Sequence, residues 1–408
     1  TPGQPDKEPL HIPLAMGLLS SDGGELDLRL EGEPADAAAP ERVFELRAGH
    51  QTLRFVGLPE RPVPSLLRGF SAPVKLLREE SDEELALRLA RDRDPFNRWD
   101  AGQRLATRVL LGLVAAGDAE ATLPDSLVAA ISRVLASSGE DPAFAAECLT
   151  LPSEGYLAEQ LEVVEPILVH DMRTLARRRL AEALRAPLLE VYGDSRSRGE
   201  YRLDPQSIGR RRLANLCLGY LMELGGEAER GLALEQYREA GNMTDSMGAI
   251  ATLAAHDCPE RAEVLEDFYG RWRDDPLVID KWLALQATAP LPGVLDEVRG
   301  LLEHPAFDLR NPNRVRALIG AFASGNPRGF HGSGTAGYAF VADQVLRLDP
   351  LNPQVAARLM GAFTRWRRYA EPRRELMREQ LQRIYHTPKL SPDVYEVAHK
   401  SLADAESA

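Results

Sequence analysis

The sequence has few cysteines, few aromatic residues and no apolar run long enough for a membrane helix. Its 408 residues include 3 cysteines, and 6% are aromatic. The cysteines lie far apart without Cys-x-x-Cys spacing, so we predict free thiols in a reducing compartment and a cytoplasmic location. The apolar run at 109–116 is far shorter than the roughly 20 residues that a membrane helix needs. We therefore predict no membrane span.

Negative charge exceeds positive charge. Lys and Arg total 49 against 62 Asp and Glu, which gives a formal net charge of -13. A protein that binds nucleic acid through its phosphates needs a basic surface, so we expect no nucleic-acid partner. Two stretches, 173–185 and 365–378, are rich in arginine but carry acidic residues at helical spacing. We interpret them as solvated helix faces with local ion pairs, and Trp366 as a packing residue rather than a base-stacking one.

Motifs for metal binding and nucleophilic catalysis are missing as well. None of the 8 histidines forms a His-Glu-x-x-His helix. The densest group of potential ligands, at 256–260, straddles a predicted helix break, and no Ser-His-Asp or Cys-His set follows from the spacing. We predict no catalytic residue and no metal ligand in this chain.

Residues 1–78 carry the pattern of β-strands. Short segments with alternating apolar residues, separated by turn residues, predict a small antiparallel sheet. The candidate strands are 10–19, 26–30, 43–47, 53–56, 66–70 and 74–77. About 70 residues is short for a complete β-sandwich. We therefore predict a partial sandwich whose first strands precede residue 1, and the absence of an initial Met also suggests a piece of a longer chain.

Residues 79–408 carry the pattern of a helical domain. Seven Asp-Pro or Asn-Pro pairs suit the N-cap and first position of a helix. The pairs begin at Asp94, Asp141, Asp204, Asp275, Asn311, Asn326 and Asn352. Between them lie amphipathic stretches, for which we predict helices over 125–135, 167–192, 208–224, 278–287 and 371–384. Many helices joined by short loops, with irregular spacing, predict a superhelix like those of HEAT or armadillo repeats.

Two Asn-Pro helices near the C-terminus attract attention because of their cations. Arg314 and Arg316 lie in or just after the first turn of the helix that begins at Pro312. A cation there is unfavourable by roughly 0.3–1 kcal/mol, unless an anion binds nearby. In the second helix Gln354 and Arg358 are four residues apart and share one face. The alternative interpretation is that these are ordinary solvated surface residues.

Several stretches, in the same order along nearly the whole chain, resemble bacterial aminopeptidase N, a family of zinc metallopeptidases. They are Thr1 to Gln4, His11 to Leu14, Phe70 to Leu76, Phe96 to Ala101, Asn242 to Asp245, Asp280 to Trp282, Asn311 to Phe322 and Asn352 to Val355. The resemblance covers the end of the family's β-sandwich domain, at 1–78, and its C-terminal helical domain, at 79–408. It implies that the zinc site lies upstream of this chain.

The resemblance also implies a role for the helical domain. In this family it caps the catalytic cleft, encloses a substrate chamber and contacts the peptide, and the catalytic domain of the same polypeptide is its partner. Arg316, Gln354 and Arg358 match positions that face the peptide, so we expect them to bind substrate. The chain alone is expected to be inactive. The competing hypothesis is a stand-alone HEAT-like adaptor that binds proteins on its concave face.

Overall fold

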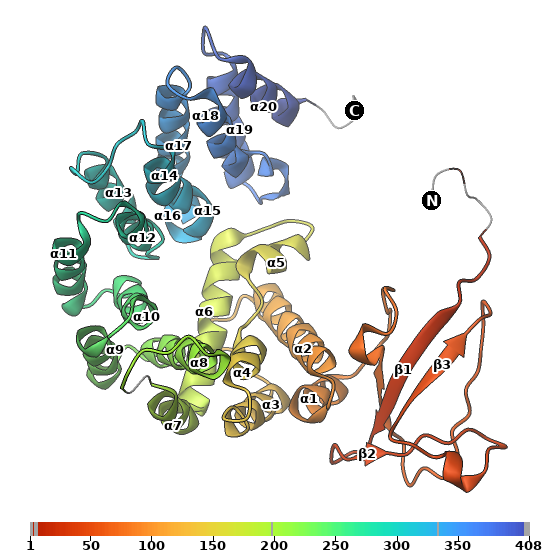
Figure 1. Ribbon diagram of the computed structural model, residues 1–408. Coiled ribbons are helices and arrows are strands. Elements are labelled where there is room, and N and C mark those ends of the chain that lie inside the picture. The colour runs from red at the N-terminus through yellow and green to blue at the C-terminus, as the bar shows by residue number, and fades with distance from the viewer. Residues whose placement is uncertain (1–2, 4–6, 197–198, 333, 404–408) are drawn as a thin grey trace.

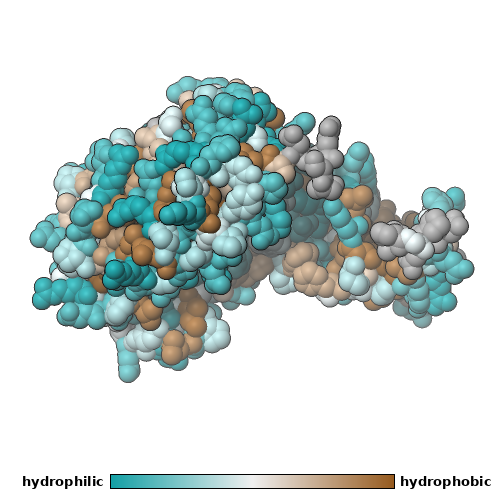
Figure 2. All heavy atoms as spheres, turned by 90° about the horizontal axis from the view of Figure 1, so that it is seen from above, coloured by the Kyte–Doolittle hydropathy of each residue, from teal (hydrophilic) through white to brown (hydrophobic). Residues whose placement is uncertain are grey.

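The computed structural model describes Gly3 and residues 7–196, 199–332 and 334–403. A small antiparallel sheet leads into a long, curved stack of helices (Figure 1), so the predicted mainly helical fold is confirmed. Seen from above, the sheet projects as a narrow arm from the larger helical mass (Figure 2). Within the stretch Thr1 to Gln4 only Gly3 belongs to the described residues.

The elements follow one another in chain order. The strands are β1 (Ile12–Leu19), β2 (Glu25–Leu26), β3 (Glu41–Leu46) and β4 (Val63–Leu66). The α-helices are α1 (Asp82–Arg91), α2 (Pro95–Ala116), α3 (Asp125–Ala136), α4 (Pro142–Leu149), α5 (Glu154–Glu159), α6 (Pro166–Ala183), α7 (Arg185–Ser195), α8 (Pro205–Met222), α9 (Glu227–Glu239), α10 (Met243–Ala254), α11 (Glu260–Trp272), α12 (Pro276–Ala287), α13 (Val294–Leu302), α14 (Pro312–Val315), α15 (Ala321–Gly325), α16 (Pro327–Gly332), α17 (Thr335–Leu348), α18 (Pro353–Leu359), α19 (Arg373–Tyr385) and α20 (Pro392–Leu402). The π-helix η3 (Arg316–Gly320) joins α14 to α15, and the 3₁₀ turns are η1 (Ala35–Ala37), η2 (Arg68–Phe70), η4 (Met360–Phe363) and η5 (Trp366–Arg368).

Strand β1 is the centre of the sheet and pairs antiparallel with β2, β3 and β4. Its residues Met16 and Leu18 pack with Leu28 and Phe44 in a small separate core. The strand predicted over 26–30 is present only at Leu26, followed by isolated bridges at Leu28 and Leu30. Two other predicted strands are wrong. Segment 53–56 forms only an isolated bridge and packs its apolar side chains on the sheet, while 74–77 has no strand partner and is exposed.

The predicted strand at 66–70 is also mostly wrong, because β4 ends at Leu66 and a tight turn follows. Leu67 and Phe70 have φ of 58° and 54°. Left-handed backbone is unfavourable for bulky side chains. The turn therefore holds Phe70 in a strained conformation that points it away from the sheet core.

The Asp-Pro and Asn-Pro pairs cap helices as the sequence predicts. Each of the seven Asp or Asn side chains accepts a backbone N–H in the first turn of the helix that it precedes. The single helix predicted over 167–192 is wrong, since α6 ends at Ala183 and α7 begins at Arg185. Pro187 explains the break, because it has no N–H to donate to the carbonyl of Ala183.

The helices are arranged in two layers around the curve (Figure 1). Helices α8, α10, α12 and the run α14–η3–α15 form the inner layer, and α7, α9, α11 and α13 form the outer layer. Contacts of α8 with α10, α10 with α12, and α12 with η3 connect successive inner helices. This is the paired-helix superhelix that the sequence predicts, with the Asn311 helix on its inner side.

The far end of the superhelix returns to α6 and the segment that precedes it. Helix α16 packs on α6, and Val164 exchanges backbone hydrogen bonds with Arg368 and Ala370. The Arg368 guanidinium donates to the carbonyls of Ala158 and Leu161 at 2.9 and 2.6 Å. An open solenoid repeat touches only its neighbours, whereas here segments about two hundred residues apart are fastened together.

The arginine-rich stretches therefore do more than form solvent-exposed helix faces. Local pairs such as Arg374 with Glu371 and Arg378 with Glu375 match the sequence interpretation. Arg368, in contrast, binds backbone across the ring closure. Trp366 is buried and donates its indole N–H to the carbonyl of Ser401 at 2.9 Å, so it is a packing residue.

A buried ion network connects the sheet to the helices. The Arg68 guanidinium contacts Glu25 at 2.9 Å and Asp92 at 3.3 Å, and Arg88 contacts Glu80 at 2.7 Å and Asp92 at 3.5 Å. Gly17 makes room for it, because a Cβ there would lie 2.3 Å from the Arg68 guanidinium carbon. The network fixes the arm on the helical domain.

Candidate functional site

Helix α18 presents Gln354 and Arg358 on one exposed face. The Asn352 side chain accepts the N–H of Val355 at 3.2 Å, and Ala356 and Leu359 bury the opposite face. Gln354 and Arg358 are both exposed. The cap and the apolar pair therefore fix the helix so that the predicted amide and guanidinium lie one turn apart in solvent.

Neither of these side chains has a hydrogen-bond or ion-pair partner within the described part of the chain. Arg358 lies in the last turn of α18, where the negative end of the helix dipole favours a cation. A free guanidinium beside a free amide can bind a carboxylate or a peptide carbonyl. The donors of the pair are thus free within the described part of the chain.

Arg316 lies on a different helix. It begins η3, a π-helical segment of 5 residues within the continuous run 312–325. Its only described polar contact is a long 3.4 Å hydrogen bond to the Asn313 side chain. Exposed residues at Asn313, Arg316 and Ser324 recur along this inner-layer helix. π-helical segments are rare and are frequent at functional sites.

The structure groups the three predicted residues only in part. Gln354 and Arg358 lie together on α18, whereas no described hydrogen bond or ion pair joins either of them to Arg316. Arg314, the other cation near the Asn311 cap, is not free. Its guanidinium contacts Asp280 at 2.5 Å and the carbonyl of Pro276 at 2.7 Å. It fastens α14 to α12, which explains a cation in that first turn without any ligand.

The described residues offer no metal site. They contain no group of three or more His, Cys, Asp or Glu placed to hold an ion. In the 256–260 cluster, His256 bonds the carbonyl of Thr252 at 2.7 Å, and the Cys258 thiol contacts the carbonyl of Leu253. These residues do not fit a zinc ion.

An exposed apolar surface lies where the arm meets the helices, and the sequence reasoning missed it. The Phe70 ring lies 4.1 Å from that of Phe96, which in turn lies 5.7 Å from Trp99. Next to Phe70 in the sequence, each residue of 73–77 is exposed, and Leu77 is 83% exposed. We call Phe70, Val74, Leu76, Leu77 and Phe96 the junction patch. Exposed apolar patches are common at protein interaction surfaces.

Comparison with known proteins decides the family. Residues 82–403 match a family model described as a domain of unknown function (DUF3458_C) with ARM repeats, and 1–79 match a companion model with an Ig-like fold. Aminopeptidase N of Escherichia coli is 39% identical over 99% of this chain and 46% of its own length. That of Caulobacter vibrioides is 40% identical over 95% of this chain and 44% of its own length.

The chain belongs to the aminopeptidase N family. It spans about half the length of the curated relatives that it matches, and the Haemophilus influenzae enzyme gives the same picture at 38% identity. A solved structure of Legionella pneumophila aminopeptidase A in complex with aspartic acid is similar, with a TM-score of 0.79 and 32% identity over 96% of this chain and 45% of that one. The predicted resemblance is therefore confirmed. No helix in the described ranges is long and apolar enough to cross a membrane.

Proposed function

We propose that this chain supplies the part of a zinc-dependent aminopeptidase N that caps the catalytic cleft, encloses the substrate chamber and contacts the bound peptide. Relatives named aminopeptidase N match 95–99% of the chain. The zinc ligands and the catalytic residues belong, in this proposal, to the portion of the enzyme outside these 408 residues. The chain is not catalytic by itself, and the three unpaired cysteines favour a cytoplasmic enzyme.

The observation that carries the proposal is the free Gln354–Arg358 pair on α18. An unpaired guanidinium can bind the C-terminal carboxylate or a carbonyl of a short peptide, and such a charge-assisted bond contributes about 1.5–3 kcal/mol. Arg316, on the inner layer of the superhelix, would offer a second cation. Held this way, the peptide presents its first bond to the catalytic portion, and the gain comes from positioning.

The junction patch suits the second partner, the catalytic portion of the same polypeptide. The relatives of this chain are about twice as long as the chain itself. They therefore contain a further protein region that could cover the junction patch. The strained turn that exposes Phe70 costs free energy that burial of the ring would offset. A stand-alone adaptor is less favoured, because the relatives matched over nearly the whole chain are peptidases.

The decisive experiment mixes this chain with the separately expressed remainder of its enzyme. We expect zinc-dependent aminopeptidase activity only in the mixture, with the chain alone inactive. Chelation and zinc repletion of each half beforehand would locate the metal. Hydrolysis by the chain alone, or a native protein of this size without zinc or peptidase activity, would contradict the proposal and favour the adaptor.

Leu77→Asp should weaken this association. Placing a carboxylate in an apolar interface is costly, so we expect at least a tenfold rise in the concentration of chain that restores half-maximal activity. The melting temperature of the chain itself should not change, since Leu77 is solvent-exposed. Leu203→Asp, at another highly exposed leucine, is the matched control. Equal effects of both variants would remove the junction patch from the proposal.

A further inference from the structure

Arg211 is a buried cation without a counter-ion. Three arginines in the described ranges are 4% exposed: Arg68, Arg88 and Arg211. The first two are surrounded by carboxylates, whereas no acidic side chain of the described residues lies within ion-pair distance of Arg211. Removing a charge from water is unfavourable unless an opposite charge compensates it. At Arg68 and Arg88 neighbouring carboxylates offset the unfavourable free energy of burying the charge. Arg211 lacks such carboxylates, so its burial requires another explanation.

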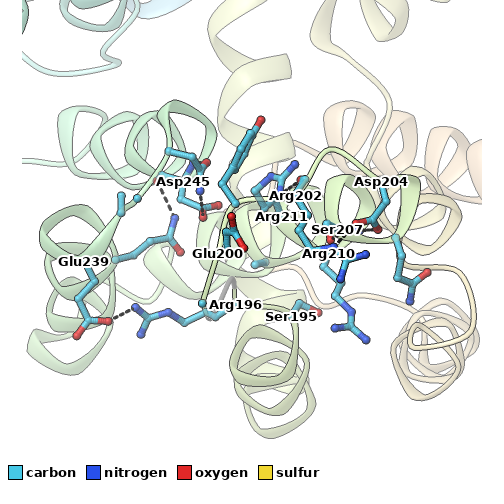
Figure 3. A pocket seen from close by; sticks show the side chains of 18 residues that line it. Ser195, Arg196, Glu200, Arg202, Asp204, Ser207, Arg210, Arg211, Glu239 and Asp245 are labelled. Carbon is cyan, nitrogen blue, oxygen red and sulfur yellow. Dashed lines mark hydrogen bonds and ion pairs between the residues drawn. The ribbon is translucent and has the colours of Figure 1, made fainter.

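Arg211 is held so that part of its guanidinium stays free. One nitrogen, Nη1, donates to the carbonyl of Arg202 at 3.0 Å, and the group lies over the Tyr201 ring with its carbon 4.8 Å from the centroid. Nε and Nη2 have no described acceptor. Arg211 lines a cavity of about 560 Å³ between the starts of α8 and α10 and the end of α9 (Figure 3). The free nitrogens are therefore available to a ligand.

The α9 and α10 side of the same cavity carries unpartnered acceptors. Gln236 is 4% exposed and donates its amide nitrogen to Asn215 at 2.7 Å and to the carbonyl of Asp245 at 2.9 Å, while its side-chain oxygen has no partner among the described residues. Asp245 is 8% exposed, and one carboxylate oxygen accepts from Asn242 at 2.7 Å. Its other oxygen has no described donor. Figure 3 places Arg211 on α8 and Asp245 on α10, with Glu200 also in the pocket.

The charges of the cavity distinguish between ligand classes. Arg196 is occupied by Glu239 at 2.7 Å, and Arg202 by Asp204 at 3.0 Å. At the rim, Arg210 and Glu200 have no described polar partner. A simple anion such as phosphate would satisfy Arg211 but would face the uncompensated carboxylates. A ligand with one positive and one negative group satisfies both sides.

We propose that this cavity, the α8–α10 pocket, binds a small zwitterion, namely a free amino acid or a short peptide. Its α-carboxylate would accept from Arg211, and its ammonium group would donate to Asp245 and Gln236. The cavity volume lies within the roughly 300–1,000 Å³ usual for small-ligand sites. The pocket belongs to helices other than α18, so this proposal does not depend on whether α18 binds substrate.

Calorimetric titration of the full chain with four probes tests the ligand class. The probes are L-alanyl-L-alanine, its N-acetyl derivative, its C-terminal amide and inorganic phosphate. We expect the dipeptide to bind, and loss of either terminal charge to weaken binding at least tenfold, with phosphate weaker still. No heat with the dipeptide at millimolar concentration overturns the proposal. Binding of phosphate or of the N-acetyl derivative as tight as that of the dipeptide overturns the zwitterion assignment.

Matched variants locate the binding. Arg211→Gln should lose at least tenfold in dipeptide affinity, and Asp245→Asn should bring the dipeptide down to the affinity of its N-acetyl derivative. Arg347→Gln, at an exposed arginine of α17 outside the pocket, is the control and should bind normally, and a loss there equal to that of Arg211→Gln would refute this pocket. Melting temperatures check folding, and we expect Arg211→Gln without ligand to melt no lower than the wild type, because it removes an uncompensated charge. If Asp245→Asn fails to fold, the rim variant Glu200→Gln and the probe series still decide the outcome.

Discussion

Replacing Arg358 by alanine in the intact enzyme should lower kcat/KM for a tripeptide by roughly ten- to a hundredfold and leave that for an aminoacyl anilide almost unchanged. The tripeptide loses a charge-assisted bond of about 1.5–3 kcal/mol, which is about one to two powers of ten in rate. The anilide has no carboxylate or second peptide group to reach α18. The measurement is steady-state kinetics with both substrates.

Two further variants sharpen this prediction. Arg347→Ala removes another exposed arginine from the neighbouring α17, where the guanidinium bonds Gln344, and should change neither substrate. Gln354→Ala removes a neutral partner and should cost the tripeptide less than Arg358→Ala, because neutral hydrogen bonds contribute about 0.5–1.5 kcal/mol. Equal losses on tripeptide and anilide for Arg358→Ala would mean that α18 does not contact the peptide.

Replacing Arg88 by methionine should destabilise the chain by about 3–5 kcal/mol, since it removes a buried cation shared by the buried carboxylates of Glu80 and Asp92. The Glu80 and Asp92 side chains that contact Arg88 are both fully buried. Chemical denaturation followed by circular dichroism gives the free energy. Arg108→Met is the control, because its pair with Asp82 is half-exposed and such pairs contribute about 0–1 kcal/mol. A loss as small as that of the control would show that water reaches the network.

The same network predicts how stability depends on pH. Burial raises the pKa of Glu80, but Arg88, Arg78 and Arg104 outweigh it and hold the pKa below its ordinary value. A carboxyl group whose pKa is lower in the folded state stabilises the fold above its unfolded pKa. This contribution disappears as the pH falls through the folded-state value. Acid unfolding should therefore begin at higher pH in Arg88→Met than in Arg108→Met.

Local sequence rules recovered most of the helical domain. The seven Asp-Pro and Asn-Pro pairs each begin a helix where predicted, because a side-chain cap and a proline act within one turn. Pro187 was the missed signal, and it divides the predicted 167–192 helix at Leu184. In the arm, alternation alone could not distinguish a paired strand from segments such as 53–56 and 74–77, since pairing depends on residues distant in sequence.

The candidate site was predicted less completely, for a related reason. The exposure of Gln354 and Arg358 followed from their spacing on one helix, but the partner of Arg314 lies on another helix, at Asp280. Arg211 carried a usable signal, because it shares a helix face with the buried Ala214 and Leu218. A cation on an apolar face is unusual enough to question, although only the fold shows that no carboxylate reaches it.

The contacts of α6 and its preceding loop with the C-terminal helices change how the whole superhelix deforms and unfolds. An open superhelix of stacked helix pairs extends by small rotations between successive pairs, and its two ends unfold independently. Here the C-terminal helices are hydrogen-bonded to the segment before α6 through Val164 and Arg368. These long-range contacts therefore fix the curvature of the superhelix. On heating, its helices should unfold in one cooperative transition instead of one pair at a time.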